Sequence, residues 1–576
     1  MQKDWIIREK IKESNLKKYP NLNPLVLQIL FNRGITEEKE IRDFLNEDGL
    51  IHDPFLFREM DKALELIIFH IKKGNKIIIY GDYDADGVSS SAVLYDVFSL
   101  LKADVEVYIP HRVYEGYGIN KDALDTLKNK DTKLIVTVDG GIRAKEEVDI
   151  AKKMGIDVII TDHHIPPQSK DDYPKCIILN PLSLDETYPF KYLAGVGVAF
   201  KLASALILKS KLTEEEQEKL IKWQLDLVAL GTVADCVPLR GENRALVKKG
   251  LKELDKERRL GLKELSSVAH LKKDKKYDSW NIGFQLAPRI NAVGRLDHAE
   301  TAFQLLVEKN KRQAHKIAIE LDRRNSQRQE YTTKLFNFID ENLKEQKNNP
   351  ILIALCPLGE NENNNWNEGV IGLVAGRLSS KYYRPALVLT ETAEGLKGSG
   401  RSIVDFNLIK AIEESAQFLT KYGGHPMACG FSLEKNNLES FKQKILEIAQ
   451  KKIDINKIKP KIFVDMEIFL EDLDLDFLED LEKLKPFGEG NQKPVFLSKN
   501  ISVLDVFVMG MDNQHIKLKI KTENSKVLNA LAFSQAEKWS NIKIGDKIKM
   551  VYSPEINNFN GRKEVQLKII DIKHEK

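Results

Sequence analysis

The fold is decided between residues 76 and 87, which read KIIIYGDYDADG. The first five residues are short, apolar and β-branched, which predicts a buried strand of a parallel sheet. An acidic, glycine-bounded turn follows at once, and Ser90 to Leu101 is compatible with a helix. A strand that passes through a turn into a helix is typical of the start of a right-handed βαβ unit.

Two further strand-like runs end in acidic turns. Residues 134–138 (LIVTV) precede Asp139, and residues 157–161 (DVIIT) precede the sequence Asp-His-His. Ligands of such sheets bind at the carboxyl ends of the strands, so these turns are expected to meet at one edge. A fourth acidic segment stands at 233–235 (VAD).

These acidic segments predict a metal site. Carboxylates crowded together repel one another and titrate upward unless a cation neutralises them, and Asp with His suits Mn²⁺ or Mg²⁺. Two divalent ions are the simplest explanation. Each segment alone has another reading, because an Asp after a strand is commonly a turn residue or a helix N-cap. The pattern Asp82-x-Asp84-x-Asp86-Gly87 also imitates an EF-hand calcium loop, but Val93 stands where that loop needs Glu.

The ordered motifs resemble a known family. Residues 83–87 (YDADG) and 162–164 (DHH) resemble the DHH phosphoesterase superfamily. Residues 284–295 (FQLAPRINAVGR), 398–402 (GSGRS) and 423–425 (GGH) resemble its RecJ branch, the single-strand-specific 5′ exonucleases. Together the motifs span nearly the whole chain, which makes the resemblance specific.

The resemblance implies a division of ligands between the two ions. Asp84 and Asp139 would hold one ion, and Asp86, Asp139, His163 and Asp235 would hold the other. Asp139 would then bridge the pair.

Three neighbouring residues have less direct roles. Asp82 stands where some members of the superfamily place a His ligand, so it is either a ligand or a neighbour of the ligands. His164 is expected to face the scissile phosphate, and Asp162 to orient its neighbours through hydrogen bonds. Asp139 and His164 are therefore the expected catalytic residues of a two-metal-ion hydrolysis.

Basic and glycine-rich motifs predict the substrate contacts. Residues 398–401 (GSGR) offer backbone N–H groups, a hydroxyl and a guanidinium to a phosphate. A terminal 5′ phosphate is expected at Ser399, Arg401 and Arg289, although each Arg could instead form a surface salt bridge. The full set of expected substrate-binding residues is Arg112, Tyr114, Arg289, Asn291, Ser399, Arg401 and His425.

Composition limits the class of protein. The 576 residues are 42% hydrophobic and 30% charged, which predicts a soluble chain of several domains. No stretch approaches the roughly 20 apolar residues of a membrane helix, and the four cysteines form no CxxC pair, so a cytoplasmic protein without membrane contact is expected. The net charge is only +3, so nucleic acid would have to bind at local patches.

The predicted fold class is α/β, with a parallel-sheet DHH domain joined by a long helix to a smaller α/β DHHA1 domain, and a β-barrel (OB-fold) at the C-terminal end. Period-two alternation at 516–520 and 565–569 favours the barrel, in which Trp539, Phe559 and Arg562 are candidates for contacts with a single strand. The expected domains are a helical lead-in at 1–50, the DHH domain at 51–265, a connecting region with the helix at 266–348, the DHHA1 domain at 349–455 and the barrel at 456–576.

The expected function is a 5′ to 3′ exonuclease specific for single-stranded DNA, which releases 5′ mononucleotides in recombination and repair. A DHH phosphatase or oligonucleotide hydrolase of short substrates, a pyrophosphatase and a non-catalytic replication scaffold share parts of the pattern. The expected partner is single-stranded DNA with a 5′ end. The resemblance adds a single-strand-binding protein and a helicase, and the chain is expected to be a monomer.

Overall fold

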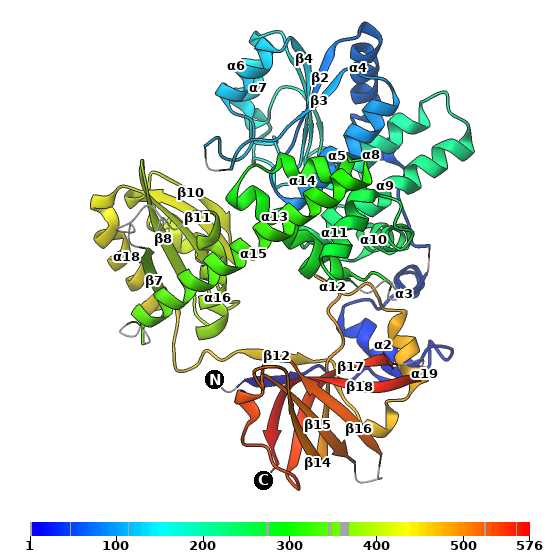
Figure 1. Cartoon of the computed structure of the whole chain (residues 1–576), viewed down its shortest axis with the longest axis vertical. Helices are drawn as coiled ribbons and strands as arrows, with labels where there is room; N and C mark the ends of the chain where they lie inside the picture. The colour runs from blue at the N-terminus through cyan, green and yellow to red at the C-terminus, as the bar shows by residue number, and fades with distance from the viewer. Residues whose placement is uncertain are drawn as a thin grey trace. The chain divides into compact units, whose positions relative to one another are not determined.

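The chain forms two compact units in a computed structural model (Figure 1). The first contains His52–Asp235 and Gly250–Pro460, and the second contains Gln2–Ile51, Cys236–Lys249 and Lys461–Lys576. The structure describes residues 3–46, 48–112, 114–271, 276–343, 346, 348–356, 368–522, 526–559 and 562–575. In this described part, every helix is too short or too polar to span a membrane.

A five-stranded parallel sheet in the order β3-β2-β4-β5-β6 lies at the centre of the first part of unit one (Figure 1). Its strands are β2 (Lys76–Tyr80), β3 (Val105–Tyr108), β4 (Thr132–Val138), β5 (Asp157–Thr161) and β6 (Ile177–Leu179). The β-branched side chains of β2 are fully buried, as a strand covered on both faces requires. The parallel sheet predicted from the sequence is confirmed.

Helices cover both faces of this sheet, so both faces are packed (Figure 1). One face packs against α6 (Lys121–Asn129) and α7 (Lys145–Lys153). The other packs against α4 (Met60–Lys73), α5 (Ala85–Leu100) and α8 (Gly195–Leu208). Helix α5 also packs against α9 (Glu214–Ala234), and it is buried on nearly every side, which explains its apolar and small residues.

A helical stretch joins this sheet to a second one. It contains α11 (Leu260–Val268), α12 (Ser279–Asn281), the π-helical turn η3 (Ile282–Leu286), α13 (Ala287–Leu296), α14 (Glu300–Val307) and α15 (Lys311–Asn342). The 32-residue α15 is the long connecting helix that was predicted within residues 266–348.

The second sheet of unit one has the order β10-β11-β9-β8-β7, and only its β7–β8 pair is parallel. Its strands are β7 (Leu352–Cys356), β8 (Ala386–Thr392), β9 (Gly395–Arg401), β10 (Lys421–His425) and β11 (Ala428–Leu433). Helix α16 (Glu368–Tyr382) packs against β8 and β9, and the remaining helices are α17 (Leu408–Glu413) and α18 (Leu438–Lys452). This is the expected smaller α/β domain.

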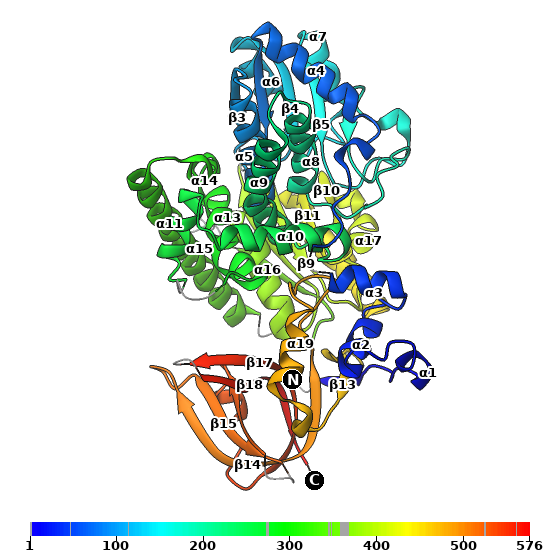
Figure 2. The same ribbon diagram turned by 90° about the vertical axis from the view of Figure 1, so that its right-hand side faces the viewer.

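Unit two is built on a closed five-stranded barrel (Figure 2). Its strands are β14 (Phe496–Met509), β15 (His515–Lys521), β16 (Val527–Ala532), β17 (Lys547–Phe559) and β18 (Arg562–His574). The order is β14-β15-β16-β18-β17, and β17 pairs back with β14 to close the barrel. Alternating side chains such as Leu518 and Ile520 fill the interior. The barrel agrees with the predicted OB-fold.

The N-terminal residues are part of unit two, and they are not entirely helical. Strand β1 (Asp4–Ile7) pairs in parallel with β12 (Lys461–Val464), and the Trp5 indole donates a 3.0 Å hydrogen bond to Asp571 of β18. The helices α1 (Glu13–Leu16), α2 (Pro24–Asn32) and α3 (Glu38–Leu45) follow. Also in unit two are α10 (Gly241–Leu254) in part, β13 (Met466–Glu467) and α19 (Leu475–Glu482).

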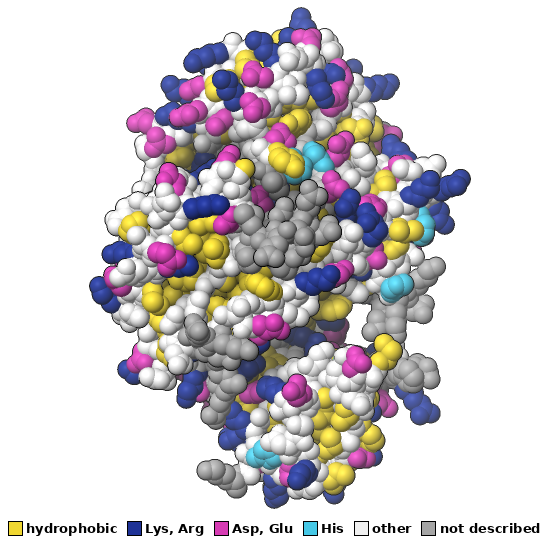
Figure 3. Space-filling model, turned by 60° about the vertical axis from the view of Figure 1, so that its left-hand side comes forward, with side chains coloured by type: hydrophobic (Ala, Val, Ile, Leu, Met, Phe, Trp, Pro, Cys, Tyr) yellow, Lys and Arg dark blue, Asp and Glu magenta, His cyan; other side chains and the backbone are white. Residues whose placement is uncertain are grey.

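Charge is distributed evenly on the face drawn in Figure 3, where basic and acidic side chains are interspersed. This agrees with the net charge of +3. Any attraction for a polyanion therefore has to come from local groups of cations.

Candidate metal centre and substrate site

Acidic and imidazole side chains meet at the carboxyl edge of the parallel sheet. Their ligand atoms form three sets, and within each set the atoms lie no more than 4.8 Å apart. The sets are Asp82, Asp84 and Asp139; Asp86, His163 and Asp235; and Asp139, His163 and His164. All six predicted ligands and His164 are therefore brought together. Asp139 and His163 each belong to two sets, so the sets form one continuous centre.

Two helix N-termini hold the carboxylates that follow β2. Asp84 is the N-cap of α5, and its Oδ1 accepts hydrogen bonds from the N–H groups of Asp86 (2.8 Å) and Gly87 (3.1 Å). Asp86 is buried and accepts from the N–H groups of Gly195 (2.7 Å) and Val196 (2.8 Å), which begin α8. The orientation of both carboxylates is thus set by backbone groups, which do not move with side-chain rotation.

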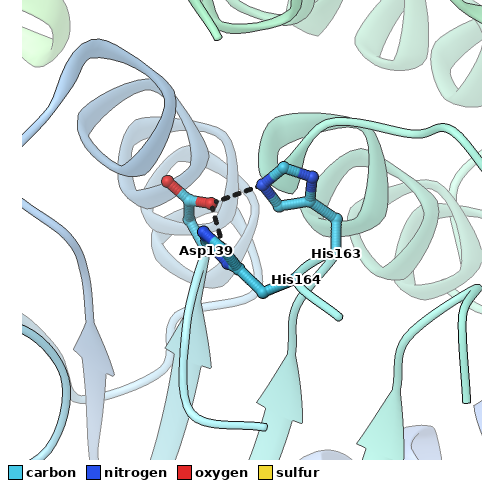
Figure 4. Close-up of side chains that lie close together, drawn as sticks. All are labelled: Asp139, His163 and His164. Atoms are coloured by element: carbon cyan, nitrogen blue, oxygen red, sulfur yellow. Dashed lines mark ion pairs between the residues drawn. The ribbon is translucent and has the colours of Figure 1, made fainter. Parts of the chain in front are cut away.

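Asp139, which belongs to two of the three sets, has an unusual backbone conformation. Its φ of 57° is left-handed, a region that Asp tolerates better than most residues, and its N–H donates to the Thr161 carbonyl at the end of β5. The Asp139 Oδ1 is 3.1 Å from His163 Nε2 and 4.0 Å from His164 Nδ1 (Figure 4).

The centre has the electrostatic character of a cation site. Burial, together with repulsion from neighbouring carboxylates, raises the pKa of every one of four carboxyls. The pKa values of Asp82 and Asp139 lie well above the usual range, the pKa of Asp86 is about 7, and the pKa of Asp235 is about 9. Among the described residues, Asp82 Oδ1, Asp139 Oδ1 and His163 Nε2 are buried without a hydrogen-bond partner. Divalent cations would satisfy these atoms and relieve the repulsion, so the side chains present fit a metal pair.

The two neighbouring histidines are unlike. Burial and the charge on His164 lower the pKa of His163 to about 4, which keeps its imidazole neutral, as a metal ligand must be. Burial also opposes charge on His164, but its 2.8 Å hydrogen bond to Asp162 raises its pKa to about 9. Asp162 also accepts from the N–H groups of His163 and His164. Asp162 therefore fixes the backbone of both histidines and the ring of His164, and the raised pKa favours the protonated form of His164.

Tyr117 contacts the same histidine, and the sequence did not single it out as a site residue. Its hydroxyl lies 3.2 Å from His164 Nδ1 and donates to the Asp139 carbonyl oxygen at 3.1 Å. The flanking Gly116 and Gly118 have φ near +80°, so this loop needs glycine to bring the ring in. In the sequence, a tyrosine between two glycines is the signal that could have identified Tyr117 as a site residue.

A glycine-rich face of the second sheet carries part of the predicted substrate site. By strand register, Ser399 of β9, Gly430 of β11 and Gly423 of β10 form one row, and the next row places His425 in line with Arg401. A Cβ added at Gly423 or Gly430 would meet nothing within 4 Å. The missing side chains leave room for a polymer backbone to approach Ser399 and Arg401.

The charges of four arginines act on one another beside this face, and two of the four, Arg295 and Arg328, were not predicted. Arg295 of α13 donates to the Gly369 carbonyl oxygen, and burial with repulsion from Arg112, Arg328 and Arg401 lowers its pKa to about 9. Burial and Arg112 also lower the pKa of Arg401. Guanidiniums that repel one another in this way favour an anion such as a phosphate among them. Arg295 therefore joins the candidate phosphate site.

The two predicted residues of α13 are already engaged within the protein. Arg289 pairs with Asp322 at 2.8 Å and donates to the Gln285 carbonyl oxygen, so part of its hydrogen-bonding capacity is used internally. Asn291 accepts a 2.7 Å hydrogen bond from the Ala85 N–H and thus supports the loop of Asp84 and Asp86.

The loop after β3 carries the last two predicted contacts. The Arg112 guanidinium lies 4.9 Å from the centre of the Tyr83 ring, and Tyr114 is 86% exposed. Val113 between them lies outside the described residues. Both side chains remain available to a ligand, because neither is buried in the protein.

The barrel does not use Trp539 as predicted. Trp539 is buried in the barrel core, so its candidacy for base stacking was wrong, while Arg562 is exposed and the Phe559 side chain lies outside the described residues. Phe507, Lys517, Leu531 and Lys568 instead form a row across the outside of four strands. Half-exposed Phe533 lies beside it, 6.0 Å from the Lys568 ammonium.

Comparison with known proteins identifies related domains in three parts of the chain. Family models match residues 76–232 (DHH family, N-terminal domain), 348–451 (DHHA1 domain) and 464–571 (RecJ OB domain). The single-stranded-DNA-specific exonuclease RecJ of Bacillus subtilis is 39% identical over 563 residues, which cover 97% of this chain and 69% of that protein. The protein of the same name from Haemophilus influenzae is 31% identical over 561 residues, 95% of each chain.

Two solved structures of a RecJ protein have a similar fold. The crystal structure of RecJ from Thermus thermophilus in complex with Mn²⁺ matches with a TM-score of 0.82 at 25% identity, and covers 100% of this chain and 80% of that one. The Mg²⁺ complex of the same protein matches with a TM-score of 0.76 at 24% identity, covering 100% and 79%.

Proposed function

Because this chain belongs to the RecJ family, we propose that it is a metal-dependent exonuclease specific for single-stranded DNA, which works from the 5′ end and releases 5′ mononucleotides. The observation that carries the proposal is the arrangement of one carboxylate and histidine centre beside a group of arginines in the same unit. The first can activate a phosphodiester, and the second can hold the end of a strand.

The centre is proposed to hold two divalent ions, Mn²⁺ or Mg²⁺. Asp84 and Asp139, with Asp82 beside them, would hold one ion, and Asp86, Asp139, His163 and Asp235 would hold the other, which makes Asp139 the bridge. When bound, the ions supply Lewis-acid activation of the scissile phosphate and of the attacking water.

The protein's own residues stabilise the transition state and fix its geometry. Protonated His164, held by Asp162 and Tyr117, is placed to balance the charge that develops on the non-bridging phosphate oxygens. The N–H groups of Gly195 and Val196 hold the Asp86 carboxylate in one orientation. Preorganised charge of this kind typically contributes a few kcal/mol to catalysis.

We assign the preference for the 5′ end of the strand to the group of arginines. Ser399, Arg401 and Arg295 would bind a terminal 5′ phosphate, with the first phosphodiester over the metal centre. Proximity of Arg295 to Asp84, whose charge acts on its pKa, supports this placement. The glycine face of β10 and β11 would admit the sugar-phosphate backbone, with Arg112, Tyr114 and His425 at its borders.

The barrel is proposed to bind the strand further from the cleaved end. A row of aromatic and basic side chains on an OB-fold surface suits unpaired bases and phosphates, and Phe507, Phe533, Lys517 and Lys568 supply it. From the family relation we also propose a cytoplasmic monomer, which acts in recombination and repair with a single-strand-binding protein and a helicase.

The test uses 5′-labelled and 3′-labelled single strands, and a duplex, with Mn²⁺ or Mg²⁺. Mononucleotides should be released from the 5′ end of single strands only, and Asp139→Ala should abolish the release. Release that begins at the 3′ end, or full activity of Asp139→Ala, would contradict the proposal. Hydrolysis of pyrophosphate without nuclease activity would assign the centre to a pyrophosphatase instead.

A further inference from the structure

One helical segment both supports the metal loop and carries an exposed aromatic pair. Residues 279–296 run without a break through α12, η3 and α13. Near its end, Asn291 accepts from the Ala85 N–H, and a Cβ on Gly294 would lie 2.3 Å from the Tyr83 carbonyl oxygen. The C-terminal half of the segment is therefore packed tightly against the loop that carries Asp84 and Asp86.

The N-terminal half presents two large aromatic rings to solvent. Trp280 is 53% exposed and Phe284 is 69% exposed. Their ring centroids are 5.7 Å apart and their planes are 24° apart, so the rings are stacked on each other. Aromatic side chains of this size usually bury their surface, and an ordered pair left exposed is typical of a binding surface.

The backbone beneath the pair is rigid and lies close to a proposed metal ligand. Ile282 and Leu286 are fully buried and anchor the turn. A Cβ on Gly283 would lie 3.7 Å from Val233, two residues before Asp235 on α9. The turn η3 is π-helical, a conformation that is rare and frequent at functional sites.

We propose that Trp280 and Phe284 form a stacking platform for unpaired bases on the 3′ side of the scissile phosphodiester. The inference rests on the proposed function, because the bases would belong to the single-stranded substrate. The aromatic pair and the metal loop are joined by one helical segment, which continues into α13. At 1.5 Å per residue, Phe284 and Trp280 lie about 10 and 16 Å from Asn291 along the segment. At ~3.4 Å per stacked nucleotide, that span corresponds to about three to five nucleotides.

Bases suit this surface because each has an apolar face, and stacking needs no particular sequence. The amides of Asn281 and Gln285, hydrogen-bonded to each other at 2.8 Å, lie in the same turn and offer polar contacts to base edges. The platform would keep the strand extended from the metal centre and would favour substrates long enough to reach it.

The decisive experiment compares two 5′-phosphorylated substrates, a dinucleotide and a 12-mer, in steady-state assays of the full chain. The variant with both Trp280→Ala and Phe284→Ala should raise the KM for the 12-mer about fivefold to 100-fold, as loss of one to two stacked bases predicts. The kcat for both substrates and the KM for the dinucleotide, which is too short to reach the platform, should not change. The aromatic-preserving variant with Trp280→Phe and Phe284→Tyr should behave like the wild type.

The matched control is Phe69→Ala, which removes a half-exposed ring from α4 and should leave both substrates unaffected. A second measurement is the affinity of a fluorescent 12-mer in EDTA, with one abasic site moved along the strand. Wild-type protein should lose affinity when the abasic site falls three to five nucleotides from the 5′ end, and the Ala variant should not.

An unchanged KM and affinity for the 12-mer in the Ala variant would overturn the platform, even if the chain is an active exonuclease. Absence of nuclease activity in the wild type would instead overturn the proposed function. The binding measurement in EDTA separates the two failures, because it needs neither metal nor turnover.

Discussion

Replacing Gly195 with Ala should lower the activity strongly while the protein remains stable. Gly195 begins α8, and its N–H, which Ala retains, holds Asp86. A Cβ at this position would lie 2.6 Å from Asp139 Oδ1 and 2.7 Å from Asp139 Cβ. Rotation of the Asp139 side chain cannot relieve the second contact, because Cβ does not move with χ1. The carboxylate itself must therefore shift.

The size of the effect follows from the overlap. Ordinary van der Waals contact begins at 3.4 Å, so the carboxylate has to move by about 0.8 Å. A misplacement of about 1 Å costs roughly 100-fold in rate, or ~2.7 kcal/mol, when the group must meet exact geometry. We expect kcat/KM on a single strand to fall about 100-fold. The free energy of unfolding should change by only ~1 kcal/mol, since Ala also reduces the entropy of the unfolded chain.

The assay pairs steady-state hydrolysis of a labelled single strand with urea unfolding. Gly197→Ala, two residues further along the same helix, is the matched control, because the atom nearest to its Cβ would be the terminal Cδ2 of Leu193 at 3.1 Å, which a change of rotamer can move. That variant should keep most of its activity. If Gly195→Ala is as active as Gly197→Ala, the position of the Asp139 carboxylate does not limit the reaction, and the bridging role assigned to it is refuted.

Three further predictions concern a buried ion-pair network, the metal ions and the candidate phosphate site. Arg259 is buried between Asp96 of α5 and Asp226 of α9, each at 3.0 Å, so Arg259→Met should cost about 3–5 kcal/mol in urea unfolding, whereas Arg323→Met at an exposed pair should cost under ~1 kcal/mol. Burial raises the pKa of the site carboxyls, so metal-free protein should lose stability as pH rises from 6 to 9, and the gain in Tm on adding Mn²⁺, measured by thermal unfolding, should grow over that range. In steady-state assays, Arg295→Gln should raise the KM about tenfold for strands with a 5′ terminal phosphate, because the phosphate carries the charge that Arg295 would pair with. The KM for strands that end in a 5′ hydroxyl should not change.

The sheet and its acidic edge were predictable because their signals are local. β-branched runs of five residues mark β2 and β5, and each ends directly at an acidic turn. Burial on both faces favours apolar residues in the middle of such strands, so the pattern has few other interpretations. Parallel order then brings the strand ends together without further information.

Long-range pairing was not predictable from any local signal. Strand β1 is four residues long and pairs with β12, more than 450 residues away in the sequence. Its burial pattern is mostly exposed, so no alternation of apolar residues marks it. Trp539 was misread for a related reason, because it lies between strands in a short 3-10 helix, where period-two patterning does not say which way the ring points.

The missed arginine, by contrast, was within reach of the sequence. Asn291 and Arg295 are four residues apart, which places them on one face of a helix, whereas Arg289 is two residues from Asn291 and points to the opposite side. Once the motif is recognised as helical, Asn291, which faces the metal loop, shares its side of the helix with Arg295 and not with Arg289. The structure follows this rule, with Arg289 paired to Asp322 of α15 and Arg295 among the other arginines. Helical phase therefore decides between two arginines that motif recognition alone treats as equivalent.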